Sequence, residues 1–315
     1  MFKWLTRKQQ RSTAAKPQLR LEGLEVREVP AVLIQLDYSR DLTGFFNNPE
    51  ARAIMERAAS EFGNSLNANL AAIVPHGGNT WTATFFDPAT GGQTGVANLS
   101  VGANTLRIFV GGRAMSRSEA GFGGYGGTSI SGSQAWLNAV ETRGHSGFSP
   151  WGGSIAFDTN QRWHFGQTTD GLDSTELDFY SVAVHELGHV LGIGTAPEWM
   201  SLASGGYFYG ANASAVYGGA VPLNPNASHW ADGVIAGGQG ASLDPTLTYG
   251  TRVTWSALDA AALRDLGWGA SGPVAATTGA DLPAAAAAPA LNARQPFAFT
   301  GHADGLVSTF VMSGG

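Results

Sequence analysis

The chain has 315 residues, with 18 Lys and Arg against 24 Asp and Glu, which gives a formal net charge of −6. Nothing in this balance indicates a basic face that could neutralise phosphates, so we expect no nucleic-acid partner. Charged residues make up 13% of the chain and hydrophobic residues 43%, a composition that excludes a disordered protein and allows a substantial core.

Cysteine and long apolar stretches are both missing from the sequence. Without cysteine the 315 residues can form no disulfide, and they cannot supply the cysteine-switch latency that many zinc proteases use. No run of 18 apolar residues occurs, so we expect no membrane span.

Residues 1–31 form a basic segment ahead of the globular part. Within it, residues 21–31 (LEGLEVREVPA) resemble the L-E-x-L-E-x-R-x-x-P-A signature found at the start of many exported bacterial surface proteins. The resemblance implies a secreted or cell-surface location. The alternative is a short amphipathic segment with no sorting role.

The globular pattern starts at Val32. Residues 32–38 predict a first strand, and Asn48 opens a helix that runs to Leu66. Alternating residues predict a strand at 80–86, and two further strands are expected at 105–110 and 153–158. Between them, the glycines of residues 121–126 favour a loop, since no strand-to-helix unit frames them as a nucleotide-binding motif.

The central feature of the sequence is the pair His185 and His189, with Glu186 between them. The apolar residues around them, from position 179 to 191, predict a buried helix. Residues four apart lie on one face of a helix, so the two imidazoles can bind one metal ion while Glu186 points beside it. An unpaired buried charge is costly, so the apolar setting favours a metal site over a chance pattern on a surface helix.

Signals at both ends support this helix. Thr175 and Asp178 have the spacing of a capping box, which would satisfy amides of the first turn. Gly192 follows the last apolar positions, where a left-handed residue commonly ends a helix. We therefore expect a helix that is capped at Thr175 and ends at Gly192.

With Gly192, these residues match the first part of H-E-x-x-H-x-x-G-x-x-H, and the segment resembles the metzincin metallopeptidases, matrixin-like ones in particular. The resemblance implies a zinc ion held by His185 and His189, with Glu186 as the general base. The third histidine of the signature would fall at Thr195, which is not a plausible zinc ligand.

A catalytic zinc normally keeps three protein ligands, so the third must come from elsewhere in the chain. His229 lies downstream, between the zinc helix and the next expected helix. This order resembles leishmanolysin-type metzincins, in which an insertion separates the glycine from the third histidine. We predict that His229 completes the site, with Asp232 and Glu198 as oxygen-ligand alternatives.

Two further segments resemble segments of the family, but each departs from the family's pattern. Metzincins carry a methionine turn beneath the metal, and the matching segment is residues 241–245, with Leu243 in the place of methionine. A leucine can fill a similar volume. Residues 152–158 resemble the matrixin strand before the zinc helix, a region that also holds structural zinc and calcium in matrixins.

Ala156 and Gln161 stand where ligands of those structural ions are expected, which argues against both ions. A calcium site remains an alternative to an acidic surface loop. Its candidate ligands are Asp158, Asn160, Asp170 and Asp173.

The C-terminal part contains one more helix and a low-complexity segment. Residues 254–268 predict a closing helix, in which Asp259 and Asp265 are expected to face solvent or to cap. Residues 271–295 are rich in Ala and Pro and predict a linker. Residues 296–315 form a tail that could be an edge strand or the start of an appended module.

Together these features predict an α+β fold over residues 32–270, with a mixed twisted sheet, an active-site helix and a smaller C-terminal subdomain. The leading function is a secreted, monomeric zinc endopeptidase acting on protein or peptide substrates. Glu186 would take a proton from the zinc-activated water, and an edge strand near 118–126 would pair with the substrate.

An alternative function is a catalytically inactive surface or adhesive module on the same scaffold. The missing signature histidine and turn methionine motivate this alternative. Glu186 argues against it, because a carboxylate in an apolar setting is a burden unless catalysis needs it.

Overall fold

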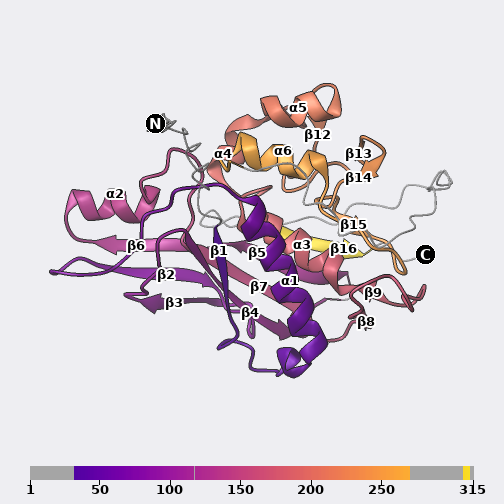
Figure 1. Ribbon diagram of the computed structural model, residues 1–315, viewed down its shortest axis with the longest axis horizontal. Helices are drawn as coiled ribbons and strands as arrows, with labels where there is room; N and C mark the ends of the chain where they lie inside the picture. The colour runs from indigo at the N-terminus through magenta and orange to yellow at the C-terminus, as the bar shows by residue number, and fades with distance from the viewer. Residues whose placement is uncertain (1–31, 117, 270–307, 313–315) are drawn as a thin grey trace, which may run out of the picture.

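The computed structural model describes residues 32–116, 118–269 and 308–312 (Figure 1). The predicted sorting segment 1–31, the predicted linker 271–295 and most of the predicted tail 296–315 lie outside these residues. Within the described part of the chain, no helix is long and apolar enough to cross a membrane.

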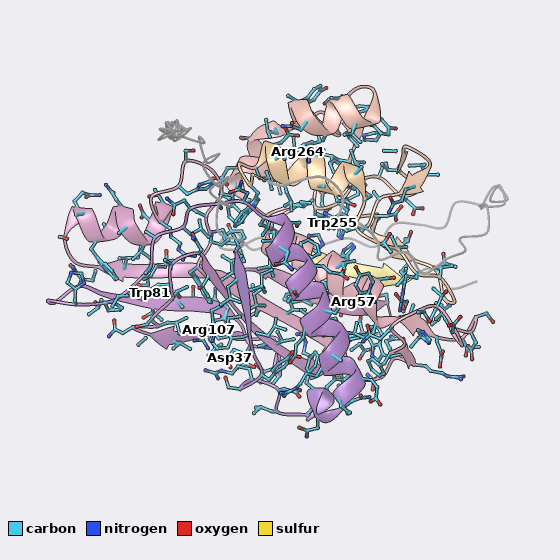
Figure 2. All side chains as sticks on the ribbon, in the orientation of Figure 1. Asp37, Arg57, Trp81, Arg107, Trp255 and Arg264 are labelled. Atoms are coloured by element: carbon cyan, nitrogen blue, oxygen red, sulfur yellow. The ribbon has the colours of Figure 1, made fainter. Side chains whose placement is uncertain are left out.

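A six-stranded mixed sheet forms the centre of the fold. β1, β4 and β7 are parallel neighbours, and they correspond to the strands expected at 32–38, 105–110 and 153–158. β5 runs antiparallel to β7 on one side and to β16 on the other, and β15 is parallel to β16. Arg107 donates to Asp37 across the β1–β4 pair (3.0 Å, Figure 2). In sheet order the strands are β1 (Leu33–Asp37), β4 (Thr105–Arg113), β7 (Gly152–Asp158), β5 (Glu119–Tyr125), β16 (Ser308–Met312) and β15 (Thr246–Leu247).

The predicted loop at residues 121–126 is wrong, because residues 121–125 belong to β5 and only Gly126 lies outside the strand. Glycine is required at positions 121 and 123 because a larger side chain would clash with Glu186. A Cβ on Gly121 or Gly123 would come within 2.8 Å of the Glu186 carboxylate. The strand near 118–126 expected at the substrate site therefore forms, but β16 covers its outer side, so β5 is not an edge strand.

A three-stranded antiparallel sheet packs on the face of the central sheet that carries Phe109 of β4. The alternation predicted for residues 80–86 is confirmed, since Trp81, Ala83 and Phe85 are buried and meet Phe109 of β4. Helix α2 was not expected from the sequence and closes the same cluster through Trp136. The bounds are β3 (Gln93–Ala97), β2 (Thr80–Phe86), β6 (Gly127–Ser131) and α2 (Gln134–Thr142).

Helices α1 and α3 cover the opposite face of the central sheet and pack against each other. A short 3-10 helix, η1 (Phe45–Asn47), precedes α1 (Pro49–Ser65), and the Asn48 side chain caps α1 by accepting from Glu50 N, as the sequence predicts. α3 (Phe179–Val190) is buried on every side and contacts β5 and β7. The fully buried helix expected around His185 is therefore confirmed.

The start of α3 differs from the predicted capping box. Asp178 is the N-cap, and its carboxylate accepts from Ser181 N (3.0 Å), whereas the Thr175 hydroxyl bonds to Asp173. Arg252 binds the same Asp178 carboxylate through two nitrogens, at 2.6 and 3.0 Å. Two very short strands, β8 (Trp163–His164) and β9 (Leu177–Asp178), lead the chain into this cap.

The end of α3 is as predicted. Gly192 is left-handed (φ 106°), and its N–H donates to His189 O while Ile193 N–H donates to Gly188 O, both at 3.1 Å. These two bonds form a Schellman motif, which satisfies the last carbonyls of the helix. The chain turns away at this point and leaves His189 in the final turn.

The residues after α3 form three helices and several two-residue strands above the central sheet (Figure 1). The closing helix expected at 254–268 is α6, and α5 packs against it. Asp259 of α6 makes a capping box with Ser256 but is fully buried, so the expectation that it faces solvent is wrong. The elements are α4 (Pro197–Leu202), α5 (Ala211–Tyr217), α6 (Ala257–Asp265), β10 (Ala203–Ser204), β11 (Tyr207–Phe208), β12 (Val221–Pro222), β13 (Ile235–Ala236) and β14 (Gln239–Gly240).

Arg252→Met is expected to lower the free energy of unfolding by about 3 kcal/mol, because it leaves the buried Asp178 carboxylate without its cation. Chemical denaturation would measure the loss. Arg162→Met is the matched control: it breaks an exposed ion pair with Asp173, which water screens, so the loss should be much smaller. Equal losses in the two variants would contradict the importance of the Arg252 pair.

Candidate metal centre

Three histidine side chains meet beneath α3. The Nε2 atoms of His185, His189 and His229 lie 3.0, 3.1 and 3.2 Å from one another, and all three residues are buried. Within the described residues, this is the one group of three or more potential ligands close enough to share a metal ion. The separations suit one ion about 2 Å from each nitrogen.

Hydrogen bonds on the far side of two rings decide which nitrogen carries the proton. His185 Nδ1 lies 2.7 Å from Ser242 O, and His189 Nδ1 lies 2.8 Å from Ile193 O. A carbonyl oxygen can only accept, so both Nδ1 atoms carry hydrogen and both Nε2 lone pairs point into the cluster. Convergent lone pairs repel one another, and a cation between them would relieve that repulsion.

His229 reaches the cluster because its backbone packs against the turn after α3. Gly194 is left-handed (φ 74°), and a Cβ there would sit 1.7 Å from Ser228 O, so only glycine allows this approach. The Asn224 side chain accepts from His229 N (3.1 Å), and His229 Nδ1 lies 2.9 Å from Ser228 Oγ. The loop is thereby fixed on both sides of the histidine.

The next residue, Trp230, anchors the same loop to α6. Its indole donates to Asp259 Oδ1 (2.8 Å), and its ring packs on Trp199, 4.9 Å between centroids. The other Asp259 oxygen accepts from both the backbone N–H and the hydroxyl of Ser242, at 2.8 and 2.9 Å. Since Ser242 O is the acceptor for His185, one carboxylate connects the supports of two of the three histidines.

The residue at the signature's third position has a different role. Thr195 is buried, and its hydroxyl donates to His189 O at 2.7 Å. Neither oxygen-ligand alternative joins the histidine group. Asp232 accepts from the Thr246 hydroxyl, and Glu198 lies in the first turn of α4.

Glu186 lies on α3 next to the metal-binding face and points at β5. Its two carboxylate oxygens have no hydrogen-bond partner among the described residues, and they lie against Gly121 and Gly123. Burial raises the pKa of Glu186 well above its usual range, and the charge of Arg113 opposes that rise only in part. The carboxylate is thus a strong proton acceptor beside the histidine cluster.

The pKa values of the three histidines are lowered, whereas that of Glu186 is raised. Burial lowers the pKa of His189 to about 4, and it lowers the pKa of His185 and His229 well below the ordinary value, with the neighbouring imidazoles adding to the effect. Neutral imidazoles are the form that binds metal. The cluster therefore keeps its ligand form into mildly acidic solution.

Leu243 occupies the floor of the centre, as the resemblance to a methionine turn implies. The residue is fully buried, and a Cβ on Gly188 of α3 would come within 2.8 Å of its side chain. Leucine therefore supports the helix between His185 and His189 by packing alone.

Calcium binding is not supported. The Asp158 carboxylate accepts from Met115 N (2.9 Å), Asn160 N and the Gln161 amide, which leaves it little capacity for an ion. Asp170 accepts from Thr168. Asp173 caps its own loop by accepting from Thr175, as expected of the acidic surface loop.

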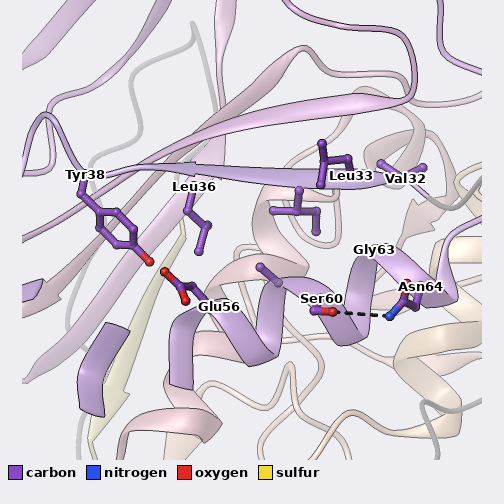
Figure 3. A pocket seen from close by; sticks show the side chains of 10 residues that line it. Val32, Leu33, Leu36, Tyr38, Glu56, Ser60, Gly63 and Asn64 are labelled. Carbon is purple, nitrogen blue, oxygen red and sulfur yellow. Dashed lines mark hydrogen bonds between the residues drawn. The ribbon is translucent and has the colours of Figure 1, made fainter. Parts of the chain in front are cut away.

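A surface pocket of about 440 Å³ lies between β1 and α1 (Figure 3). Tyr38 and Glu56 face one another across it, and no histidine lines it. Because β1 is at the opposite end of the sheet from β16, this pocket is not part of the candidate centre.

Comparison with known families gives one partial match. The sequence model of the matrixin family matches residues 135–209, which include α3 but end before His229. No curated protein and no solved structure matches the chain. The match supports a metzincin-like protease domain, and the buried group of three histidines fits zinc binding.

Several supporting residues were missed from the sequence. Gly121 and Gly123 make room for Glu186, Gly194 admits the His229 loop, and Asp259 ties that loop to Ser242. The tryptophan after His229 and the Ser–Asp spacing at the start of α6 were visible signals, but neither indicated that the two meet.

The metal-free protein is expected to lose stability as the pH falls from about 6.5 to about 4. Unfolded histidines take up a proton near pH 6.5, whereas folded His189 resists protonation until about pH 4. This difference corresponds to about 3 kcal/mol near pH 4. Urea unfolding in the presence of a chelator, compared between pH 7 and pH 4.5, would measure it.

Glu186 contributes with the opposite sign, because its raised pKa disfavours the fold as the pH rises above 4.5. The measurement should therefore use the Glu186→Gln background. Adding His189→Gln should then reduce the acid-induced loss. An unfolding free energy that does not change with pH in either variant would refute the expectation.

Proposed function

We propose that this protein is a secreted zinc endopeptidase. The observation that carries the proposal is the convergence of three buried, neutral imidazoles next to a buried carboxylate that has no hydrogen-bond partner in the described part of the chain. His185, His189 and His229 would hold the metal, and Glu186 would act as the general base.

Zinc bound by three nitrogens supplies Lewis-acid chemistry, polarising a carbonyl and making water more acidic. Glu186 would take the proton of the attacking water, helped by its raised pKa, and pass it to the leaving nitrogen. The Nδ1–H bonds of His185 and His189 to backbone carbonyls would hold the rings in orientation.

The substrate would be an extended segment of a protein or peptide. β5 lies directly beside Glu186, so a peptide that pairs with β5 would bring its backbone past the carboxylate. Backbone pairing recognises any extended chain, which suits an endopeptidase with broad substrates.

The location outside the cell rests on sequence alone. The signature at residues 21–31 supports export, and those residues lie outside the described part of the chain. The proposal of secretion is therefore separate from the proposal of zinc chemistry.

One zinc ion per chain is expected, and His229→Ala should weaken its binding by orders of magnitude, because a two-histidine site lacks the third ligand. Elemental analysis of metal-stripped and zinc-reloaded protein gives the stoichiometry, and competition with a chelator gives the affinity. His76→Ala is the control, since His76 is an exposed histidine away from the cluster. Equal affinity in the His229 and His76 variants would exclude His229 as a ligand.

Glu186→Gln should keep the fold and the zinc while lowering kcat/KM by about a thousandfold or more on an unfolded protein substrate, because it removes the base without removing a ligand. Glu50→Gln at the exposed start of α1 should leave cleavage unchanged. If zinc-loaded wild type cleaves no member of a broad peptide library, the inactive surface module becomes the better proposal.

A further inference from the structure

The strand β16 occupies a slot beside the candidate centre. Residues Ser308–Met312 pair antiparallel with β5 on one side and parallel with β15 on the other. The same strand also lies against α3 (Figure 1). Backbone pairing with β5 thus involves Ser308, Thr309 and Val311, and pairing with β15 involves the last two residues, Val311 and Met312.

Both strands that flank β16 are connected to residues of the candidate centre. On the β5 side, Ser308 pairs with Gly123 and Thr309 with Phe122, next to the two glycines that pack on Glu186. On the other side, β15 follows the turn of Leu243, and the preceding Ser242 supports His185. β16 therefore passes between the wall that faces the base and the wall that supports a ligand.

The ladder with β5 is irregular at the point nearest Glu186. The register shifts between Thr309, paired with Phe122, and Val311, paired with Glu119. The shift falls at Ala120 and Gly121, and Gly121 is the residue whose Cβ would meet the Glu186 carboxylate. The irregular part of β16 thus lies opposite a stretch of β5 that packs on Glu186.

We propose that β16 is an intramolecular, substrate-like occupant that keeps the protease latent. This inference rests on the proposed function. It is supported by the burial of His185, Glu186, His189 and His229, each exposing 2% of its surface or less. A centre that must admit a peptide cannot stay buried in the active form, so activation requires β16 to leave the slot.

The chain offers a reason for such a device. Its 315 residues contain no cysteine, so they cannot block zinc with a thiolate. Pairing in cis has a high effective concentration, which lets a short segment compete with substrate at modest intrinsic affinity. Release of the segment would then expose a slot that is already shaped for an extended peptide.

The test is a pair of full-length double variants. Thr309→Pro with Phe310→Pro removes two successive N–H groups, which point to opposite edges of a strand, so the one that faces β5 is lost and pairing with β5 is weakened. Thr309→Ala with Phe310→Ala keeps both N–H groups and controls for the loss of the side chains.

Two readouts are needed. Hydrogen exchange of the metal-free protein reports on the amides of β5, which should exchange at least tenfold faster in the proline variant and not in the alanine variant. Zinc-loaded protein should cleave an unfolded protein with a kcat/KM at least tenfold higher in the proline variant. Mass spectrometry should show residues 308–312 still joined to the wild-type chain.

The outcomes separate the two proposals. Unchanged exchange at β5 would overturn the seating of β16, whatever the enzyme does. Faster exchange with unchanged cleavage, or a wild-type chain cut within 308–312, would overturn the inhibitory role. If neither zinc-loaded protein cleaves any substrate, the protease function itself fails and the latency proposal falls with it.

Discussion

The hydrogen bonds to the carboxylate of Asp259 are the interactions on which the candidate metal centre depends. It is fully buried, and it accepts from Trp230 in the loop of the third histidine, from Ser242 behind His185, and from Ser256 at the start of α6. A buried charge is costly unless several donors surround it, and here three separate segments supply them. Two of the residues that satisfy this anion, Trp230 and Ser242, also hold His229 and His185 in place.

The fold holds the three imidazoles in an arrangement that is unfavourable without a cation. Nε2 lone pairs about 3 Å apart repel one another, and burial prevents protonation from relieving them. The fold therefore bears a cost that binding of a cation would recover, which is how metal binding and stability become coupled. Close contacts such as Gly194 against Ser228 O show how little room the loop has to relax.

Sequence reasoning succeeded where the signal was local. The helix around His185, its glycine end and the alternating strand at 80–86 follow from spacing alone. It failed where the deciding partner lies far along the chain. The ion pair that fixes the cap residue Asp178 could not be predicted, because Arg252 lies 74 residues beyond it and has no local signature. Likewise, the capping role of Asp259 could be read from its neighbours, but its burial could not.

The glycines of β5 make room for Glu186, and they also determine how this strand must be covered. Glu186 needs the space that Gly121 and Gly123 leave, and a strand built from glycine gives a weak signal that reads as a loop. Such a strand, lying at the open side of a sheet, presents unpaired backbone groups that must be covered. A substrate would cover them during catalysis, and β16 covers them here. The feature that would bring a peptide to the proposed base would thus also leave an unfilled strand position unfavourable, and in this structure a strand from the same chain fills it.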